Sequence, residues 1–196
     1  MSRDMGELEP DFREVCYRVI SACKARGVDM RPFFTARHPV EQGALWRQSR
    51  SSAEVQRKVE ELKAAGAPYL AQCILDAGPQ SGRWATNAIP GLSWHQWGLA
   101  LDCYWLVDGA AEWSASATHH GVQGYRVYAE EAETLGLRSL ASIGDPVHIQ
   151  QPKEGSPSHL LLTEIDEEMR QRWGSREWAT IQTTHSRSRS RRLVMP

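Results

Sequence analysis

The sequence predicts an α+β protein in which helices pack around a small, mostly antiparallel sheet within a single domain. Two observations lead to this fold class. Segments with helical periodicity are interspersed with a few short strand-like runs, and the regular strand–helix–strand alternation typical of a parallel sheet is missing. The chain of 196 residues is long enough for one domain to bury a core, and it contains no internal repeat.

The first half of the chain is mainly helical in pattern. Apolar side chains recur every three to four residues across 11–26, which predicts an amphipathic helix. A short extended piece around 31–35 follows it. Pro39 then begins a second helix, because proline is well suited to the first helical turn. Residues 53–65 are charged on most faces and predict a solvated helix, which breaks at the Gly-Ala-Pro sequence 66–68.

The second half mixes strand and helix patterns. Residues 77–93 are rich in glycine, proline, serine and asparagine, which predicts a loop. The apolar run 99–107 contains aromatic and branched residues and is followed by an Asp-Gly pair, as expected for a buried strand that ends in a turn. A helix is expected over 125–136, a short strand over 147–150 and a terminal helix over 161–178 that is interrupted at Gly174.

Charge and composition narrow the possible partners. The 23 basic and 24 acidic side chains give a formal net charge of −1, so no strong field attracts nucleic acid or anionic membranes. No segment reaches the roughly 18 apolar residues that would span a bilayer. The N-terminus lacks the apolar run of a secretory signal peptide. We therefore expect a protein that is made in the cytoplasm and needs another factor to reach any substrate outside the membrane. We also expect it to be a monomer.

The domain is expected to span residues 1–180, and a basic tail is expected at 181–196. Serine and arginine alternate in this tail and leave nothing to bury, which predicts disorder. The tail could act only as a solubilising terminus, or its charge could attract anionic polymers or a membrane surface. The first of these interpretations is favoured.

The cysteines and one histidine pair do not predict a metal site. The four cysteines form no C-x-x-C pair, which argues against a structural zinc cluster. Cys16 and Cys23 lie two helical turns apart within an apolar pattern, so buried free thiols are favoured over a disulfide. His119 and His120 are adjacent, and adjacent side chains in a loop seldom converge on one ion, so a solvated loop is favoured there.

Two short stretches, by contrast, suit a catalytic metal. His95 and Asp102 lie seven residues apart and would face one point if the chain turns at Gly98, while His148 would come from a neighbouring strand. Two imidazoles and a carboxylate can hold zinc with one position open for water, and Asp145 is then available for proton transfer. Taken alone, His95 could be a loop histidine and Asp145 a turn residue. The spacing by itself leaves a metal site and this structural interpretation both open.

Four motifs in the same order support a family resemblance. The pattern Ser-x-His-x-x-Gly-x-Ala-x-Asp at 93–102 resembles the signature of the zinc D-Ala-D-Ala carboxypeptidase family, which includes L-alanyl-D-glutamate endopeptidases and many phage endolysins. The Thr-Asn-Ala-x-x-Gly segment at 86–91, the Arg-x-x-x-Glu-Gln segment within 36–50 and the Asp-x-x-His-x-Gln segment at 145–150 are similar to further parts of that signature. Together they cover about residues 30–151.

The resemblance implies a hedgehog/DD-peptidase-like fold and one Zn²⁺ ion. The protein ligands it implies are His95, Asp102 and His148. It also implies that Asp145 is the catalytic base and that Arg37 polarises the scissile carbonyl and stabilises the oxyanion, where negative charge develops.

Two further residues are expected to support the site. Ser93 is expected to orient substrate or the loop that carries a ligand, and Gln42 to brace the site. The chain departs from the family pattern at Ser49, where glycine is common. It also departs at 137–144, where a Gly-Gly-x-Trp-x-x-Phe segment is common. The second departure affects a loop that we expect to border the cleft.

The resemblance therefore implies a zinc metallopeptidase that hydrolyses an amide bond in the peptide stem of peptidoglycan. The motif context is closer to the endolysin branch, which favours an L-Ala–D-Glu endopeptidase. A D-Ala-D-Ala carboxypeptidase or dipeptidase is the first alternative. A catalytically inactive, zinc-containing wall-binding module is the second, and the presence of Asp145 and Arg37 argues against it.

Overall fold

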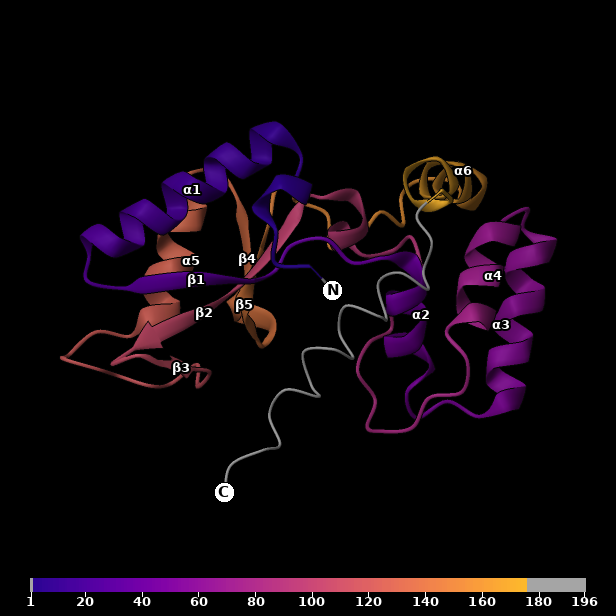
Figure 1. Cartoon of the computed structure of the whole chain (residues 1–196), viewed down its shortest axis with the longest axis horizontal. Helices are drawn as coiled ribbons and strands as arrows, with labels where there is room; N and C mark the ends of the chain where they lie inside the picture. Colours follow the sequence, from indigo (N-terminus) through magenta and orange to yellow (C-terminus); the bar gives the residue numbers. More distant parts are fainter. Residues whose placement is uncertain (1, 176–196) are drawn as a thin grey trace, which may run out of the picture. The chain divides into compact units, whose positions relative to one another are not determined.

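The computed structural model describes residues 2–175, which form an α+β fold as predicted (Figure 1). Within it, the chain builds two compact units. Among the described residues, 2–37 and 91–159 make up the first unit, and 38–90 together with 160–175 make up the second. The predicted basic tail at 181–196 lies outside the described residues.

The first unit contains the sheet, whose paired strands are all antiparallel, in agreement with the prediction. The strand order is β1-β2-β5-β4, and β3 pairs with the second half of β2 (Figure 1). The strands are β1 (Asp29–Phe34), β2 (Ala100–Val107), β3 (Ala110–Glu112), β4 (Arg138–Leu140) and β5 (Asp145–Gln150). Strand β2 is the centre of this arrangement because it pairs with β1, β3 and β5.

Helices α1 (Pro10–Ala25) and α5 (Gly124–Thr134) contribute the helical side of the first unit's core. The unit also has three short 3-10 helices, η1 (Met5–Glu7), η2 (Trp94–Trp97) and η3 (Ala141–Ile143). Side chains alternate along β2, so Leu101 and Cys103 join the apolar core while Asp102 points to the opposite face. The sheet thus separates the hydrophobic core from the face that carries the predicted metal ligands.

Gly98 turns the chain from η2 into β2, as the spacing of His95 and Asp102 requires. Its φ of 69° lies in the left-handed region, which glycine adopts without a steric penalty. A Cβ atom at this position would lie 3.0 Å from the backbone oxygen of Glu7 and 3.1 Å from the backbone nitrogen of Glu9. Both the conformation and the close approach therefore require glycine here.

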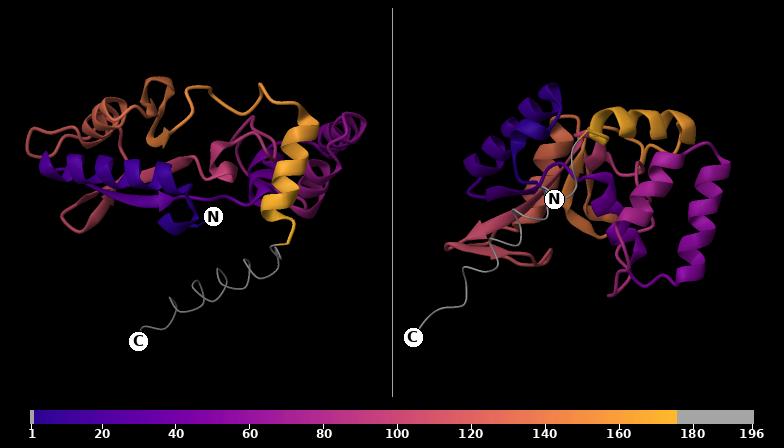
Figure 2. Two further views of the ribbon diagram at one scale, coloured as in Figure 1. Left: turned by 90° about the horizontal axis from the view of Figure 1, so that it is seen from above. Right: turned by 45° about the vertical axis from the view of Figure 1, so that its right-hand side comes forward.

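The second unit is helical. It consists of α2 (Pro39–Arg47), α3 (Ser52–Ala64), α4 (Pro68–Asp76) and α6 (Leu162–Trp173), with α3 and α4 side by side (Figures 1 and 2). Helix α4 has no capping side chain of its own at Ala67. Instead, the carboxylate of Asp166 on α6 accepts a hydrogen bond of 2.8 Å from the backbone N–H of Leu70.

The predicted helices and strands are present. Besides the three short 3-10 helices, residues 2–175 contain one further helix and two further strands that were not expected. Helix α4 begins at Pro68, a residue that indicated a break in the sequence but that occupies the first turn of the new helix. Strands β3 and β4 have only three residues each, too few to show a periodicity. Helix α6 ends at Trp173 and Gly174 is its C-terminal cap, which confirms the interruption predicted at this glycine. All four cysteines are buried free thiols, which confirms the interpretation favoured for Cys16 and Cys23.

Candidate metal centre

The centre is built first by the pairing of two strands. Asp102 on β2 and His148 on β5 are direct cross-strand partners on the face of the sheet opposite the core. Directly opposed residues in an antiparallel pair have Cβ atoms about 5 Å apart, close enough for their side chains to meet. The Nδ1 atom of His148 lies 2.9 Å from Oδ1 of Asp102.

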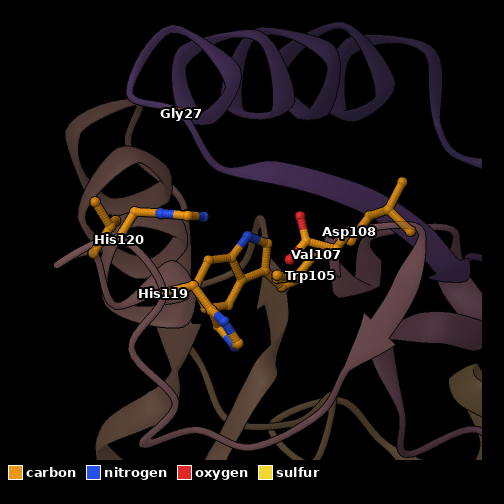
Figure 3. A pocket seen from close by; sticks show the side chains of 8 residues that line it. Gly27, Trp105, Val107, Asp108, His119 and His120 are labelled. Atoms are coloured by element: carbon orange, nitrogen blue, oxygen red, sulfur yellow. The ribbon is translucent and has the colours of Figure 1, made fainter.

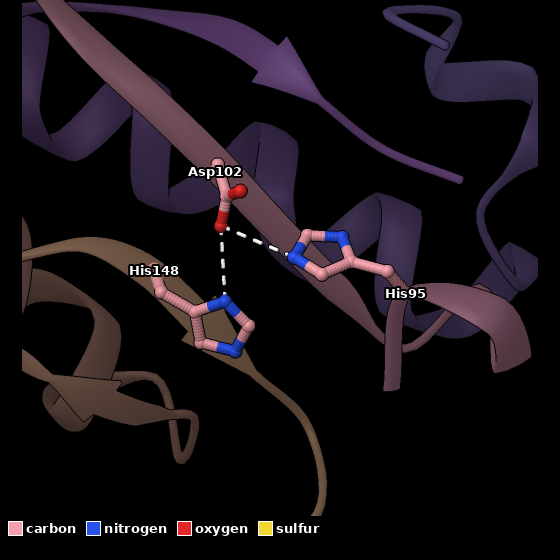
Figure 4. Close-up of side chains that lie close together, drawn as sticks. All are labelled: His95, Asp102 and His148. Atoms are coloured by element: carbon pink, nitrogen blue, oxygen red, sulfur yellow. Dashed lines mark hydrogen bonds and ion pairs between the residues drawn. The ribbon is translucent and has the colours of Figure 1, made fainter. Parts of the chain in front are cut away.

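His95 completes the group from the short helix η2 (Figure 4). Its Nε2 atom lies 3.2 Å from the same Oδ1 atom of Asp102. One ligand atom from each of the three residues lies within 4.8 Å of the others, and all three residues are buried. Over residues 2–175 this is the one group of three or more histidine, cysteine or carboxylate side chains that converges in this way. The three predicted ligands are therefore brought together.

The ring orientation of His95 is set by a backbone carbonyl. Its Nδ1 atom lies 2.8 Å from the carbonyl oxygen of Thr35. A carbonyl can only accept, so Nδ1 carries the proton and the Nε2 lone pair faces Asp102. Burial lowers the pKa of His95 despite the opposing effect of Asp102, which favours the neutral form that binds metals.

His148 and Asp102 are electrostatically coupled. Burial alone would lower the pKa of His148, but the hydrogen bond and charge of Asp102 outweigh it and the pKa is raised. Burial would likewise raise the pKa of Asp102, yet the two imidazoles hold it well below its usual range. Asp102 is thus a carboxylate, and a positive charge beside it is strongly favoured.

The chemistry of these donors fits zinc. Imidazole nitrogen and carboxylate oxygen are common zinc ligands, and three protein ligands leave a fourth position for water or substrate. Two imidazole nitrogens and a carboxylate oxygen, brought together in a buried place, need either protons or a cation between them. A divalent ion satisfies all three at once.

The predicted base, Asp145, begins β5, three residues before His148. Asp145 is an exposed residue, but partial desolvation of its carboxyl raises the pKa. The Asp102 charge adds to the rise, while the ligand imidazoles and the Arg37 guanidinium oppose it. The charges that act on this carboxyl are therefore those of the three ligands and of Arg37. A raised pKa suits a group that must take up a proton near neutral pH.

The predicted oxyanion residue, Arg37, also lies beside the ligands. Its backbone N–H donates a 3.3 Å hydrogen bond to the carbonyl oxygen of His95, and its Nη2 atom lies 4.0 Å from Oδ2 of Asp102. Burial lowers the pKa of Arg37, whereas the Asp102 and Asp145 carboxylates raise it, and a guanidinium keeps its charge at any physiological pH. A largely buried cation therefore stands next to the ligand set.

The two predicted supporting residues, Ser93 and Gln42, make hydrogen bonds with residues other than the three metal ligands. Ser93 precedes η2 and its carbonyl oxygen accepts the backbone N–H of Gln96 at 2.9 Å. Its predicted role in orienting substrate or loop stays a prediction. Gln42 belongs to the second unit, where its side-chain amide donates to the carbonyl oxygen of Ala88 at 2.7 Å. Its predicted role in bracing the site also stays a prediction.

Two residues that contact the predicted metal ligands were not predicted from the sequence. Thr35 acts through its backbone carbonyl, so its residue type carries no signal in the sequence. Gln150 accepts a hydrogen bond from Nε2 of His148 at 3.1 Å. It stands in the Asp-x-x-His-x-Gln motif, two residues after the histidine, and that position is the signal that could have identified it.

A cavity of about 250 Å³ lies beside the second half of β2, away from the metal ligands (Figure 3). His119 lines it, packs edge-on against Trp105 and has its Nε2 atom 3.1 Å from a carboxylate oxygen of Glu112. His119 and His120 belong to no converging metal-ligand group among residues 2–175, as favoured from the sequence. The lining residues include Gly27, Trp105, Val107, Asp108, His119 and His120.

Comparisons with known proteins identify the family of the chain. A family model described as VanY, D-alanyl-D-alanine carboxypeptidase, matches residues 6–137. The match includes Arg37, His95 and Asp102 and ends before Asp145 and His148, which the structure adds to the group. A search of curated proteins finds no match.

Two solved structures are similar to the chain. One is a mutant of the vancomycin resistance D,D-pentapeptidase VanY from a VanB-type resistance cassette, in complex with Zn(II). It has 23% sequence identity and a TM-score of 0.39, over 81% of this chain and 83% of that one. The other is VanYB in complex with D-alanine-D-alanine, with 22% identity and a TM-score of 0.40, over 87% of this chain and 84% of that one. From the family match over most of its length, the chain belongs to the VanY D-alanyl-D-alanine carboxypeptidase family.

Proposed function

We propose that this VanY-family peptidase is a zinc-dependent enzyme that hydrolyses an amide bond in the peptide stem of bacterial peptidoglycan, most specifically the L-Ala–D-Glu bond. The observation that carries the metal-dependent part is the convergence of His95, Asp102 and His148 on one buried point. Family membership supports the class of reaction and the class of substrate.

The residues around the centre have distinct tasks in this reaction. His95, Asp102 and His148 would hold the zinc ion, which would supply Lewis-acid chemistry by polarising the scissile carbonyl and easing deprotonation of water. The Asp145 carboxylate takes the proton of the attacking water and passes it to the leaving amine. The Arg37 guanidinium stabilises the negative charge that develops on the carbonyl oxygen. Its position 4.0 Å from Asp102 supports this role.

The choice of the L-Ala–D-Glu bond rests on motif context. The segments at 36–50, 86–91, 93–102 and 145–150 follow one another as in the endolysin branch of the family. The description of the matching family model favours the alternative, a carboxypeptidase that removes a terminal D-Ala. An inactive wall-binding module is disfavoured because the chain has both Asp145 and Arg37, and Arg37 lies 4.0 Å from Asp102.

The proposed route to the substrate is also open to experiment. Over residues 2–175, no helix is long and apolar enough to cross a membrane. We propose that the protein is made in the cytoplasm and acts on the wall after holin-type or another form of release. Separating cytoplasm from wall in cells that express the full chain, with and without a holin, would test this proposal.

Mass spectrometry of one defined muropeptide with a pentapeptide stem decides between the bonds. Endopeptidase activity leaves L-Ala on the muramic acid and releases the rest of the stem as one peptide. Carboxypeptidase activity removes only the terminal D-Ala, and that product would overturn the endopeptidase assignment. An unchanged substrate in the presence of zinc would overturn both.

A further inference from the structure

Gln150 has a buried side-chain amide that contacts the predicted metal ligand His148. It has no part in the reaction steps proposed above. It is the last residue of β5, it is 1% exposed, and it lies two residues after His148 on the same face of the strand. Its Oε1 atom lies 3.1 Å from Nε2 of His148, the ring nitrogen that faces away from Asp102 (Figure 4).

The orientation of this amide is determined by the loop that follows the strand. Its Nε2 atom donates to the carbonyl oxygens of Pro152 at 2.8 Å and Glu154 at 2.6 Å. The indole N–H of Trp94 donates to the same Glu154 oxygen at 3.1 Å and helps to hold the loop. Turning the amide by 180° would place its oxygen against two carbonyl oxygens. The oxygen of Gln150 therefore faces His148.

We propose that Gln150 is a positioning residue that keeps a proton on Nε2 of His148 and so leaves Nδ1 to bind the metal. An amide oxygen only accepts, so the neutral imidazole must donate from Nε2 and present its lone pair at Nδ1. This inference rests on the proposed zinc site, although it concerns metal binding and not the bond that is cut.

The two histidine ligands are thus oriented by different means. His95 is held by the backbone carbonyl of Thr35, which no substitution removes. His148 is held by a side chain, so its contribution can be removed by mutation. Loss of such an outer partner typically weakens metal affinity by about 10- to 100-fold.

The test compares Gln150→Leu with Gln151→Leu in the full-length protein. Gln151 is the adjacent, exposed residue, and both changes replace an amide by an apolar side chain of similar size. Zinc affinity is measured by competition with a chelating dye. We expect the dissociation constant for zinc to rise about 10- to 100-fold in Gln150→Leu and to stay within about twofold of the wild type in Gln151→Leu. Equal affinities in the two variants would overturn the proposal.

A second measurement needs no variant and so does not depend on folding of Gln150→Leu. Long-range ¹H–¹⁵N spectra of the zinc-loaded wild type identify which nitrogen of His148 carries a proton. We expect a protonated Nε2 and a metal-bound Nδ1, and the reverse would overturn the proposal. Zinc bound through Nδ1 without cleavage of any stem peptide would refute the proposed function alone. A wild type that binds no zinc would refute both.

Discussion

Asp102 and His148 are opposed across β2 and β5, so the register of the sheet itself brings Nδ1 of the imidazole to 2.9 Å from the carboxylate oxygen. The metal centre is therefore anchored in the most regular part of the first unit. Only His95 comes from outside a strand, and its place depends on the turn at Gly98.

Removing His95 should remove one of three metal ligands. Loss of a residue that only hydrogen-bonds to a ligand weakens zinc binding about 10- to 100-fold. We expect His95→Ala to weaken zinc binding by more than this, because it removes a ligand itself, and to lower peptidase activity in parallel. His120→Ala is the matched control, because His120 is exposed and belongs to no converging group of ligands in the described chain. Zinc content measured after dialysis checks both variants. Equal zinc content in the two would contradict the ligand assignment.

Replacing the base should separate chemistry from metal binding. Asp145→Asn keeps the shape of the side chain but cannot take up the water proton. We expect kcat to fall about 10²- to 10⁴-fold while zinc content stays at the wild-type level. Steady-state kinetics together with metal analysis measure the two effects, and an unchanged kcat would show that Asp145 is not the base.

Zinc affinity should depend on pH through His148. Burial alone would lower its pKa, but Asp102 outweighs this effect and raises it above the ordinary value of about 6.5. The proton that competes with the metal for His148 is therefore lost only at a higher pH than from a free imidazole. His95 does not compete in this way because burial lowers its pKa. Below the pKa of His148 we expect affinity to fall about tenfold per pH unit, and above it to level off. Dissociation constants measured across this range test the sign, and affinity that rises as pH falls would contradict it.

Replacing Gly98 by alanine should destabilise the fold more than the same change at another glycine with a similar backbone conformation. Gly27 has a φ of 79° and open space where a Cβ atom would lie, whereas a Cβ atom at Gly98 would meet two backbone atoms. We expect Gly27→Ala to destabilise the fold by about 1 kcal/mol and Gly98→Ala by more. Only the second change should also weaken zinc binding, because it displaces His95 relative to Asp102. Urea unfolding and zinc titration measure both effects, and equal losses in the two variants would contradict this role of Gly98.

Much of the centre could be predicted because its signals are local or belong to a motif. The spacing of His95, Gly98 and Asp102 already implies a turn that aims two side chains at one point. The partnership of Asp102 with His148 could only be expected in general terms, because it depends on strand register over a separation of 46 residues. The family motif, and not the physics of the spacing, identified His148 as the third ligand.

The parts that could not be predicted depend on tertiary contacts. Thr35 holds His95 through a backbone atom that every residue type has. The orientation of Gln150 follows from two carbonyl oxygens in a loop without regular structure. Helix α4 begins at a proline, and its N-terminal cap is Asp166, which accepts the backbone N–H of Leu70 from 96 residues away. No local sequence pattern therefore predicts where this helix begins.

The most direct test of the central claim, that this centre is a zinc-dependent peptidase site, is hydrolysis of a defined muropeptide before and after removal of metal. The zinc-loaded protein should cut the stem, the chelated protein should not, and zinc added back should restore cleavage. Cleavage that persists at full rate in the metal-free protein, verified by metal analysis, would contradict the claim.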